Sequence, residues 1–246
     1  MARNSQDIEK MLDELGMTHM SCHLNELMRS PESVGLTPLQ MLREVVSPQY
    51  LQYKNEQFKD NLRFSKLILQ DAEIENLRTG PERIYNENLI SQLKTLEFID
   101  DRKNMTVVGE SRAGKTYLLR AFCIEACRKN YRTRFVDYVE LMNELLIKKR
   151  ADLSRFNKRL NYYCRIQVLI IDDFLIEKYS EEATGILYSL VKKRDILGKT
   201  TMVSTQYDPS EWNTCLSNDP STGAQGDGIR SRLIDNGYFV FIERPK

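Results

Sequence analysis

Apolar side chains near the start of the chain recur every three or four residues. They do so over residues 8–15 and again over residues 20–28, and a break at 31–35 follows the second stretch. Repeats of this period place apolar side chains on one face of a helix. The pattern therefore predicts two amphipathic helices that end before residue 31.

A third helix is predicted from Thr37-Pro38-Leu39-Gln40. Thr37 and Gln40 have the spacing of a capping box, and Pro38 fits the first helical position. After Pro48, residues 50–66 predict a separate basic amphipathic helix, which either contacts DNA, serves as a hinge or packs in a bundle. Residues 1–69 are thus predicted to form a small helical domain.

From residue 70 onward the pattern changes. A linker-like stretch with its clearest break at 78–81 precedes a predicted helix at 87–99. Short apolar runs then alternate with segments of helical period, which predicts a parallel sheet in a domain of residues 70–246. The runs predicted as strands are 105–108, 134–136, 167–171, 200–204 and 238–242, and a Gly- and Asp-rich loop is predicted at 218–228.

The segment after the first of these strands carries the strongest chemical signal. Residues 109–116 match the pattern G-x-x-x-x-G-K-[ST], which predicts a phosphate-binding loop. Backbone N–H groups at the start of the following helix would point at a nucleotide phosphate. Lys115 would reach the β- and γ-phosphate oxygens, and the hydroxyl of Thr116 would be a ligand of Mg²⁺.

Two carboxylates follow the apolar run 167–171. The absence of polar alternation predicts a strand buried on both faces, so that Asp172 and Asp173 lie at the carboxyl edge of the sheet. There Asp172 can hold Mg²⁺ through water, and Asp173 can orient or deprotonate an attacking water. The residues after the fourth strand include Gln206, which either senses the γ-phosphate or caps the strand end.

Length and composition agree with a cytoplasmic protein. The chain has 246 residues, of which 41% are apolar, and its acidic N-terminus does not resemble a signal peptide. No run of 18 apolar residues predicts a membrane span. Five cysteines without a C-x-x-C pair are interpreted as buried thiols. His19 and His23 either bind a metal or are ordinary helix residues.

Basic residues gather in clusters although the formal net charge is only +1. The clusters 148–150, 155–159 and 192–194 could contact DNA phosphates, or could be solvated helix faces paired with carboxylates such as Glu140, Glu144 or Asp152. Late in the chain, Arg232, and secondarily Arg230, are candidates for an arginine finger that acts on a neighbouring subunit. A surface ion pair is the alternative for these arginines.

The motifs together resemble the IstB family, the AAA+ ATPases that help insertion-sequence transposases, and are similar to DnaC-type helicase loaders. The resemblance runs from about residue 7 to the end of the chain. It rests on the phosphate loop and on a small set of further segments, which are 11–17, 135–136, 169–174, 204–206, 210–212 and 232–233.

This resemblance implies an α/β AAA+ P-loop fold with strand order 5-1-4-3-2, helices on both faces of the sheet and no C-terminal lid domain. It implies ATP and Mg²⁺ as cofactors and a slow, DNA-stimulated ATPase that forms a homo-oligomer on duplex DNA and recruits or stimulates a transposase. The expected catalytic residues are Lys115, Asp173, Gln206 and Arg232, and the expected Mg²⁺ ligands are Thr116 and Asp172. The expected nucleotide-binding residues are Gly109, Glu110, Ser111, Arg112, Ala113, Gly114, Lys115, Thr116 and Tyr117.

Two positions depart from the family pattern. Arg112 stands where family loops usually have glycine, and Asp173 stands where the second acid is often glutamate. The shorter Asp173 side chain is consistent with slow hydrolysis and intact ATP binding. The alternative functions are a replicative helicase loader, which would differ only in its protein partner, and an ATP-binding DNA adaptor without turnover.

Overall fold

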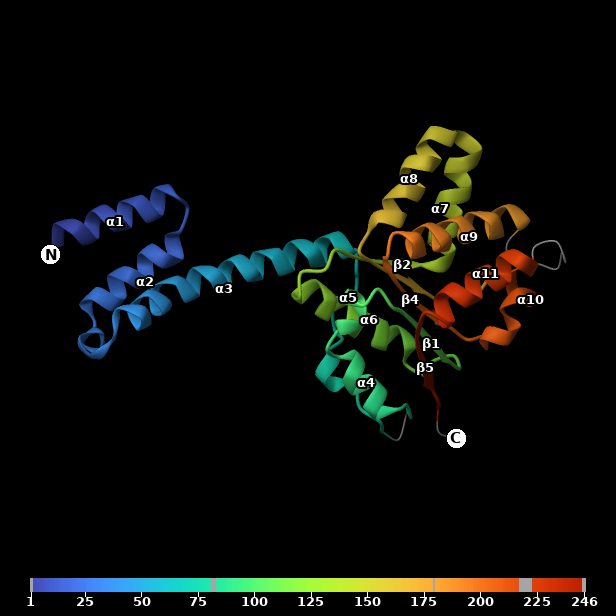
Figure 1. Ribbon diagram of the computed structural model, residues 1–246, viewed down its shortest axis with the longest axis horizontal. Helices are drawn as coiled ribbons and strands as arrows, with labels where there is room; N and C mark the ends of the chain where they lie inside the picture. The colour runs from blue at the N-terminus through green and yellow to red at the C-terminus, as the bar shows by residue number, and fades with distance from the viewer. Residues whose placement is uncertain (1, 81–82, 179, 217–222, 245–246) are drawn as a thin grey trace. The chain divides into compact units, whose positions relative to one another are not determined.

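The chain forms two compact units in the computed structural model, Met1–Asp60 and Asn61–Lys246. The structure describes residues 2–80, 83–178, 180–216 and 223–244. The first unit is helical, and the second contains every strand of the described part (Figure 1). No helix among the described residues is long and apolar enough to cross a membrane.

The first unit is a helical assembly, as the periodicity predicts. It consists of α1 (Ala2–Glu14), α2 (Thr18–Arg29), a 3-10 turn (Pro31–Gly35) and the first part of α3 (Pro38–Ser65). The capping box forms, because the backbone N–H of Thr37 donates to Gln40 Oε1 at 2.9 Å and the backbone N–H of Gln40 donates to Thr37 Oγ1 at 3.3 Å. Apolar side chains of the three helices line a groove of about 300 Å³.

The predicted interruption at Pro48 is wrong, since α3 runs without a break from Pro38 to Ser65. Proline removes one backbone N–H and crowds the preceding turn, which costs about 3 kcal/mol in a helix interior. The helix continues on both sides of this position, and Ser47 Oγ donates to the carbonyl of Arg43 at 2.7 Å. The helix therefore forms in spite of the penalty at Pro48.

The second unit contains one parallel sheet in the order β2-β3-β4-β1-β5, which confirms the predicted order. Its strands are β1 (Asn104–Gly109), β2 (Thr133–Asp137), β3 (Val168–Asp172), β4 (Thr200–Thr205) and β5 (Gly237–Ile242). β1 lies between β4 and β5, with Val108 opposite Thr205 and Phe241. The carboxyl ends of the strands consequently meet at one edge of the sheet.

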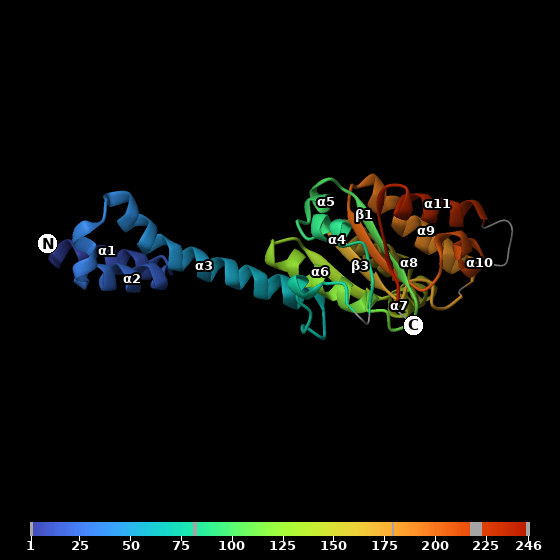
Figure 2. The ribbon, with the colours of Figure 1, turned by 90° about the horizontal axis from the view of Figure 1, so that it is seen from below.

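Helices cover both faces of this sheet (Figure 2). On one face, Leu169 and Ile171 of β3 pack with α7 (Tyr138–Ala151), α8 (Leu153–Arg165) and α9 (Glu181–Ile196). The alternate residues Val168 and Ile170 are also fully buried, and α6 (Lys115–Arg128) packs against β1 to β4. Burial on both faces explains why the strand sequence shows no polar alternation.

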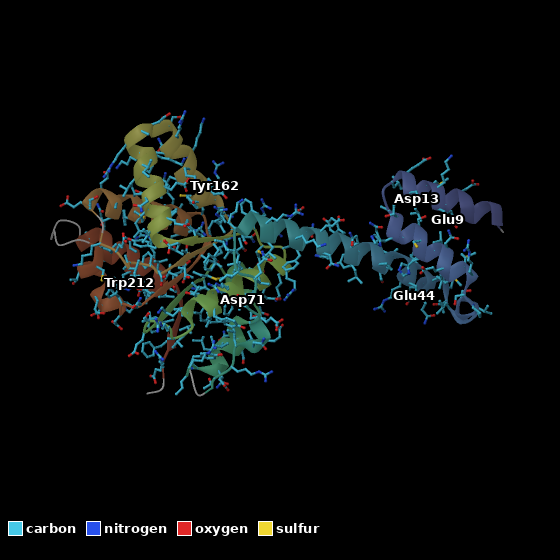
Figure 3. All side chains as sticks on the ribbon, turned by 180° about the vertical axis from the view of Figure 1, so that it is seen from behind. Glu9, Asp13, Glu44, Asp71, Tyr162 and Trp212 are labelled. Atoms are coloured by element: carbon cyan, nitrogen blue, oxygen red, sulfur yellow. The ribbon has the colours of Figure 1, made fainter. Side chains whose placement is uncertain are left out.

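Trp212 anchors the short helix α10 (Trp212–Leu216) to the core (Figure 3). Its side chain is fully buried, and its ring centroid lies 5.2 Å from that of Phe174 in an edge-to-face contact. The indole N–H donates to the carbonyl of Tyr207 at 3.2 Å. The segment after Asp173 and the segment after β4 are joined through this contact.

Three further sequence interpretations need correction. The stretch that begins at residue 70 is not a free linker, because Ala72, Ile74 and Leu77 are buried. The helix predicted at 87–99 is two helices, α4 (Glu87–Leu93) and α5 (Glu97–Asp100), separated where Leu96 takes a positive φ of 61°. Of the five cysteines, Cys22 is exposed and the other four are buried.

The glycine-rich segment before β5 also differs from the prediction. Residues 218–222 lie outside the described residues, but Gly223–Ile234 forms helix α11 instead of a loop. A methyl group added at Gly226 would lie 2.2 Å from Asn213 Oδ1, and one added at Gly228 would lie 2.7 Å from Tyr188 Cε2. These glycines therefore allow α11 to pack closely against its neighbours, which composition alone does not indicate.

Candidate nucleotide site

The predicted phosphate loop and acidic residues lie at the carboxyl edge of the sheet. Gly109 ends β1, Asp172 ends β3, and Thr205 ends β4 beside β1. Helix α6 begins at Lys115, directly after the loop. The free N–H groups of its first turn give this edge a partial positive charge that favours an anion.

Two glycines fix the course of the phosphate loop. A methyl group on Gly109 would lie 2.5 Å from the carbonyl oxygen of Ile242, so glycine lets β1 and β5 pack closely at their ends. Gly114 caps α6 with a positive φ of 96°, a conformation that glycine adopts without strain. Between them, Ser111 and Arg112 are exposed at the crown of the loop.

Lys115 lies inside the loop and is buried. Its Nζ donates to the carbonyl oxygens of Gly109 and Glu110, each at 2.8 Å. Burial lowers the pKa of Lys115, and the negative charges of Asp173 and Asp172 partly offset this effect. An ammonium group held here can interact with phosphate oxygens that approach the loop.

The two acids are joined through Ser204 on the adjacent strand β4. Ser204 Oγ donates to Asp172 Oδ1 at 2.5 Å and accepts from the backbone N–H of Asp173 at 3.1 Å. Asp172 is buried, whereas Asp173 is partly exposed. Burial and the neighbouring charge of Asp172 raise the pKa of Asp173, while Lys115 lowers it. Ser204 thus fixes one carboxylate and leaves the other available to a water molecule.

The donor set fits a magnesium ion that is bound together with nucleotide phosphates. Thr116 and Asp172 line the same cleft of about 250 Å³ and provide hydroxyl and carboxylate oxygens, the hard ligands that Mg²⁺ prefers. Among the described residues, no group of three or more His, Cys, Asp or Glu could hold a metal without such phosphates. His19 and His23 lie exposed on α2, with His23 Nδ1 3.5 Å from Glu26.

The structure separates the remaining predicted catalytic residues. Gln206 follows the end of β4 at the same edge as the phosphate loop, and its side chain is exposed. Arg232 lies elsewhere, because its carbonyl accepts a 2.7 Å hydrogen bond from Asn104, the first residue of β1. The phosphate loop follows the other end of this strand, roughly 16 Å away.

Arg83 belongs to the site although sequence reasoning missed it. Its guanidinium lies 5.4 Å from the ring centroid of Tyr117. A methyl group added at Gly114 would lie 3.3 Å from Arg83 Nη1. Tyr85, nearby in the chain, is buried, and its hydroxyl has no hydrogen-bond partner in the described structure. Arg83 lies just after the sequence break at 78–81, in a segment without strong periodicity, so no local sequence signal identified it.

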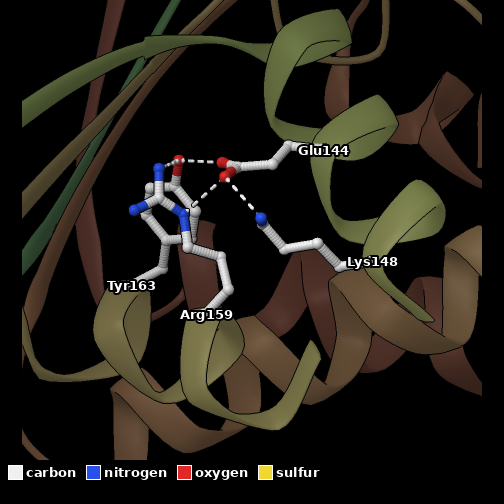
Figure 4. A network of polar contacts seen from close by, with 4 residues as sticks. All are labelled: Glu144, Lys148, Arg159 and Tyr163. Atoms are coloured by element: carbon white, nitrogen blue, oxygen red, sulfur yellow. Dashed lines mark hydrogen bonds and ion pairs between the residues drawn. The ribbon is translucent and has the colours of Figure 1, made fainter. Parts of the chain in front are cut away.

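Helices α7 and α8 form a hairpin that projects from the unit (Figure 1). Glu144 joins the two helices, because it accepts from the Tyr163 hydroxyl at 2.8 Å and pairs with Arg159 at 2.8 Å and Lys148 at 3.7 Å (Figure 4). Lys149 pairs with Glu182 at 3.1 Å. Several residues of the predicted basic clusters are therefore engaged with carboxylates, which is the alternative considered from the sequence.

The third basic cluster, 192–194, is not a continuous DNA-contacting surface. Arg194 is fully buried and donates hydrogen bonds to the carbonyls of Tyr163, Ile166 and Thr200 and to Thr201 Oγ1. Burial lowers its pKa to about 9. Arg194 connects the end of α8, including its C-cap Ile166, to β4, so a DNA role for this side chain is wrong.

The fold and the site define an ATP-binding P-loop protein of the AAA+ class. The model of the IstB-like ATP-binding proteins matches residues 10–242, and the chain belongs to this family. The chain is 26% identical to the putative insertion sequence ATP-binding protein y4pL of Sinorhizobium fredii, over 93% of this chain and 90% of that protein. It is 27% identical to the insertion sequence IS1162 putative ATP-binding protein of Pseudomonas fluorescens, over 88% and 92% of the two chains.

Solved structures with the same fold belong to replication proteins. The DnaC helicase loader is 19% identical with a TM-score of 0.55, and the match covers 70% of this chain and 97% of that chain. AMPPCP-bound DnaA from Aquifex aeolicus is 18% identical with a TM-score of 0.58, over 72% and 52% of the two chains. These similarities confirm the AAA+ fold.

Proposed function

We propose that the protein is an ATP-dependent DNA-binding regulator that assembles on target DNA and recruits or stimulates an insertion-sequence transposase. The observation that carries the proposal is the common position of Lys115, Thr116, Asp172 and Asp173 at the edge of a AAA+ sheet. The named relatives support it, because their names describe ATP-binding proteins of insertion sequences. The proposed location is the cytoplasm.

The proposed ATP chemistry divides among the residues of the edge. The loop 109–117 binds the nucleotide, Lys115 neutralises charge on the β- and γ-phosphates, and Thr116 and Asp172 hold Mg²⁺. Mg²⁺, when bound, neutralises the charge that develops on the phosphates. Asp173 orients the attacking water, and Gln206 contacts that water or the γ-phosphate. Arg83 stacks on Tyr117 beside the loop and adds a positive charge there.

The proposed arginine finger is Arg232, which acts on the nucleotide of a neighbouring subunit. Its position near the first residue of β1 keeps it away from its own phosphate loop. Arg230 is the secondary candidate, since it makes no ion pair within the described part of the chain. Hydrolysis would then depend on assembly, and duplex DNA would promote it by bringing subunits together.

Steady-state phosphate release, measured with and without duplex DNA, tests the enzymatic part of this proposal. The expected result is a slow rate that DNA increases. Nucleotide binding with no release under either condition would favour an ATP-binding adaptor. Affinity capture from the native host separates the remaining alternatives, because recovery of a transposase supports the proposed function and recovery of a replicative helicase favours a helicase loader.

A further inference from the structure

The side chain of Arg232 lies in a defined cradle between α9 and α11. Its Nε is 3.5 Å from Asp195 Oδ2, and its Nη1 donates to the carbonyl of Gly228 at 2.6 Å. The guanidinium carbon lies 5.5 Å from the ring centroid of Tyr188. Three groups therefore contact two of the three guanidinium nitrogens and one face of the group.

Gly228 is part of this cradle because of its size. A methyl group at this position would lie 2.7 Å from Tyr188 Cε2 and 3.1 Å from Arg232 Nη1. Either the tyrosine ring or the guanidinium would have to move to accommodate it. The close approach of α11 to α9 thus depends on glycine at 228, in the segment whose composition suggested a loop.

The third nitrogen of the guanidinium, Nη2, makes no hydrogen bond to any described residue. An arginine side chain has many rotamers, and ordering it opposes the formation of a productive contact. Asp195 and Gly228 already restrict these rotamers while Nη2 stays available. This arrangement is suited to a group that must meet a phosphate in a fixed geometry.

We propose that Asp195 is a positioning residue for the arginine finger, and that Tyr188 and Gly228 complete the cradle that directs Arg232 toward a neighbouring subunit's γ-phosphate. This inference rests on the proposed function, in which Arg232 acts in trans. The side chains of Arg232 and Asp195 are 25% and 34% exposed, so their ion pair adds little to stability. Its expected effect is on catalysis.

The test is the Asp195→Asn variant, which keeps the shape of the side chain and removes its charge. The expected result is a roughly tenfold lower DNA-stimulated kcat with an unchanged KM for ATP, as for the loss of an interaction made in the transition state. Asp235→Asn is the matched control, because Asp235 is exposed one residue beyond α11 and has no ion pair in the described structure. This control should hydrolyse ATP at the wild-type rate.

Subunit mixing separates a positioning role from damage to the variant's own site. Lys115→Ala subunits lack a working phosphate loop but carry an intact finger, so mixing them with Asp195→Asn subunits should restore part of the lost ATPase. Wild-type kcat in Asp195→Asn, or a loss that Lys115→Ala subunits do not restore, would overturn the positioning role. Arg232→Ala is measured in parallel. Wild-type activity in that variant would instead overturn the finger itself.

Discussion

Two residues of the candidate site adopt a backbone conformation that favours glycine, asparagine or aspartate. Arg112 in the phosphate loop has a φ of 63°, and Asp173 has a φ of 51°. Family loops usually have glycine at the position of Arg112. Arg112 adopts the same left-handed backbone conformation at a steric cost of about 1–2 kcal/mol. Aspartate tolerates this region better than most residues with a β-carbon, which gives a local reason for Asp173 where glutamate is common.

Arg112→Gly should therefore stabilise the protein by about 1 kcal/mol, because relief of the left-handed strain exceeds the added entropy of the unfolded chain. Urea unfolding without nucleotide measures this change. Lys158→Gly is the control, since Lys158 is an exposed residue inside α8 where glycine should cost about 1 kcal/mol. A loss of stability in Arg112→Gly would contradict the strain.

ATP binding and ATP hydrolysis should separate in two variants. Lys115→Ala should abolish ATP binding, because it removes the buried cation of the phosphate loop. Asp173→Asn should bind ATP with nearly wild-type affinity but should not hydrolyse it, because the amide cannot accept a proton from water. Calorimetry measures binding, and phosphate release measures turnover. Hydrolysis by Asp173→Asn at the wild-type rate would refute the role of Asp173 in orienting water.

The stability of Asp173→Asn should depend on pH in a defined direction. Burial and Asp172 raise the pKa of Asp173, so the folded protein binds this proton more tightly than the unfolded chain. The protonated Asp173 carboxyl therefore stabilises the wild-type fold at low pH. This stabilisation is lost as the pH rises from about 4, the ordinary pKa of an aspartate, through the raised pKa of Asp173. The asparagine variant does not titrate, so its stability relative to wild type should increase between pH 4 and pH 7 in urea titrations. A pH-independent difference would contradict the raised pKa.

At the scale of elements, the α7–α8 hairpin separates basic residues that are already paired from those that are available. Lys148 and Lys149 have carboxylate partners at 3.7 Å and 3.1 Å. Arg150 and Lys158 are exposed and have no ion pair within the described residues. If the hairpin contacts DNA, the second pair should supply most of the phosphate contacts.

The double variant Arg150→Ala, Lys158→Ala should lower the salt dependence of duplex DNA binding by about two in the slope of log K against log salt. The variant Lys148→Ala, Lys149→Ala removes the same charge and should change the slope less, because these side chains are neutralised by Glu144 and Glu182. Fluorescence anisotropy at several salt concentrations provides both slopes. Equal slopes for wild type and the Arg150, Lys158 variant would exclude these two residues from the interface.

Elements with strong local signals were predictable from the sequence. The phosphate loop has a fixed residue spacing, and the run 168–171 is buried on both faces. The pattern of residue types therefore predicted that Lys115 and Asp172 lie at the same edge of the sheet. The strand order came from the family resemblance, and the structure confirms it.

Elements that depend on tertiary packing were not predictable in this way. Pro48 lies inside a continuous helix, and Gly226 and Gly228 lie in α11 where neighbouring side chains leave no space for a β-carbon. The partners of charged side chains were equally unpredictable from the sequence, since Glu144 on α7 contacts Arg159 and Tyr163 on α8. Arg83 reaches the phosphate loop through the fold, without any sequence motif that includes it.

At the scale of the whole molecule, the two parts of the proposed catalytic centre lie at opposite ends of the same strand. The phosphate loop follows Gly109, whereas the Arg232 carbonyl contacts Asn104. The strand between them spans roughly 16 Å, more than twice the reach of an arginine side chain. A single subunit therefore has a binding site for ATP but cannot place its own Arg232 on the γ-phosphate.

Hydrolysis should consequently require contact between subunits, and the ATPase rate per subunit should rise with protein concentration before reaching a plateau. An arginine finger accelerates phosphoryl transfer by about 10³-fold or more, so isolated subunits should be nearly inactive although they bind ATP. Phosphate release is measured over a dilution series with duplex DNA in constant ratio, and sedimentation velocity on the same samples gives the fraction assembled. Arg232→Ala should assemble with the same concentration dependence but remain slow throughout the series. If the rate per wild-type subunit stays constant at dilutions where sedimentation finds only monomers, each subunit hydrolyses ATP alone. Arg232 would then have only a structural role, through its contacts to Asp195 and Gly228.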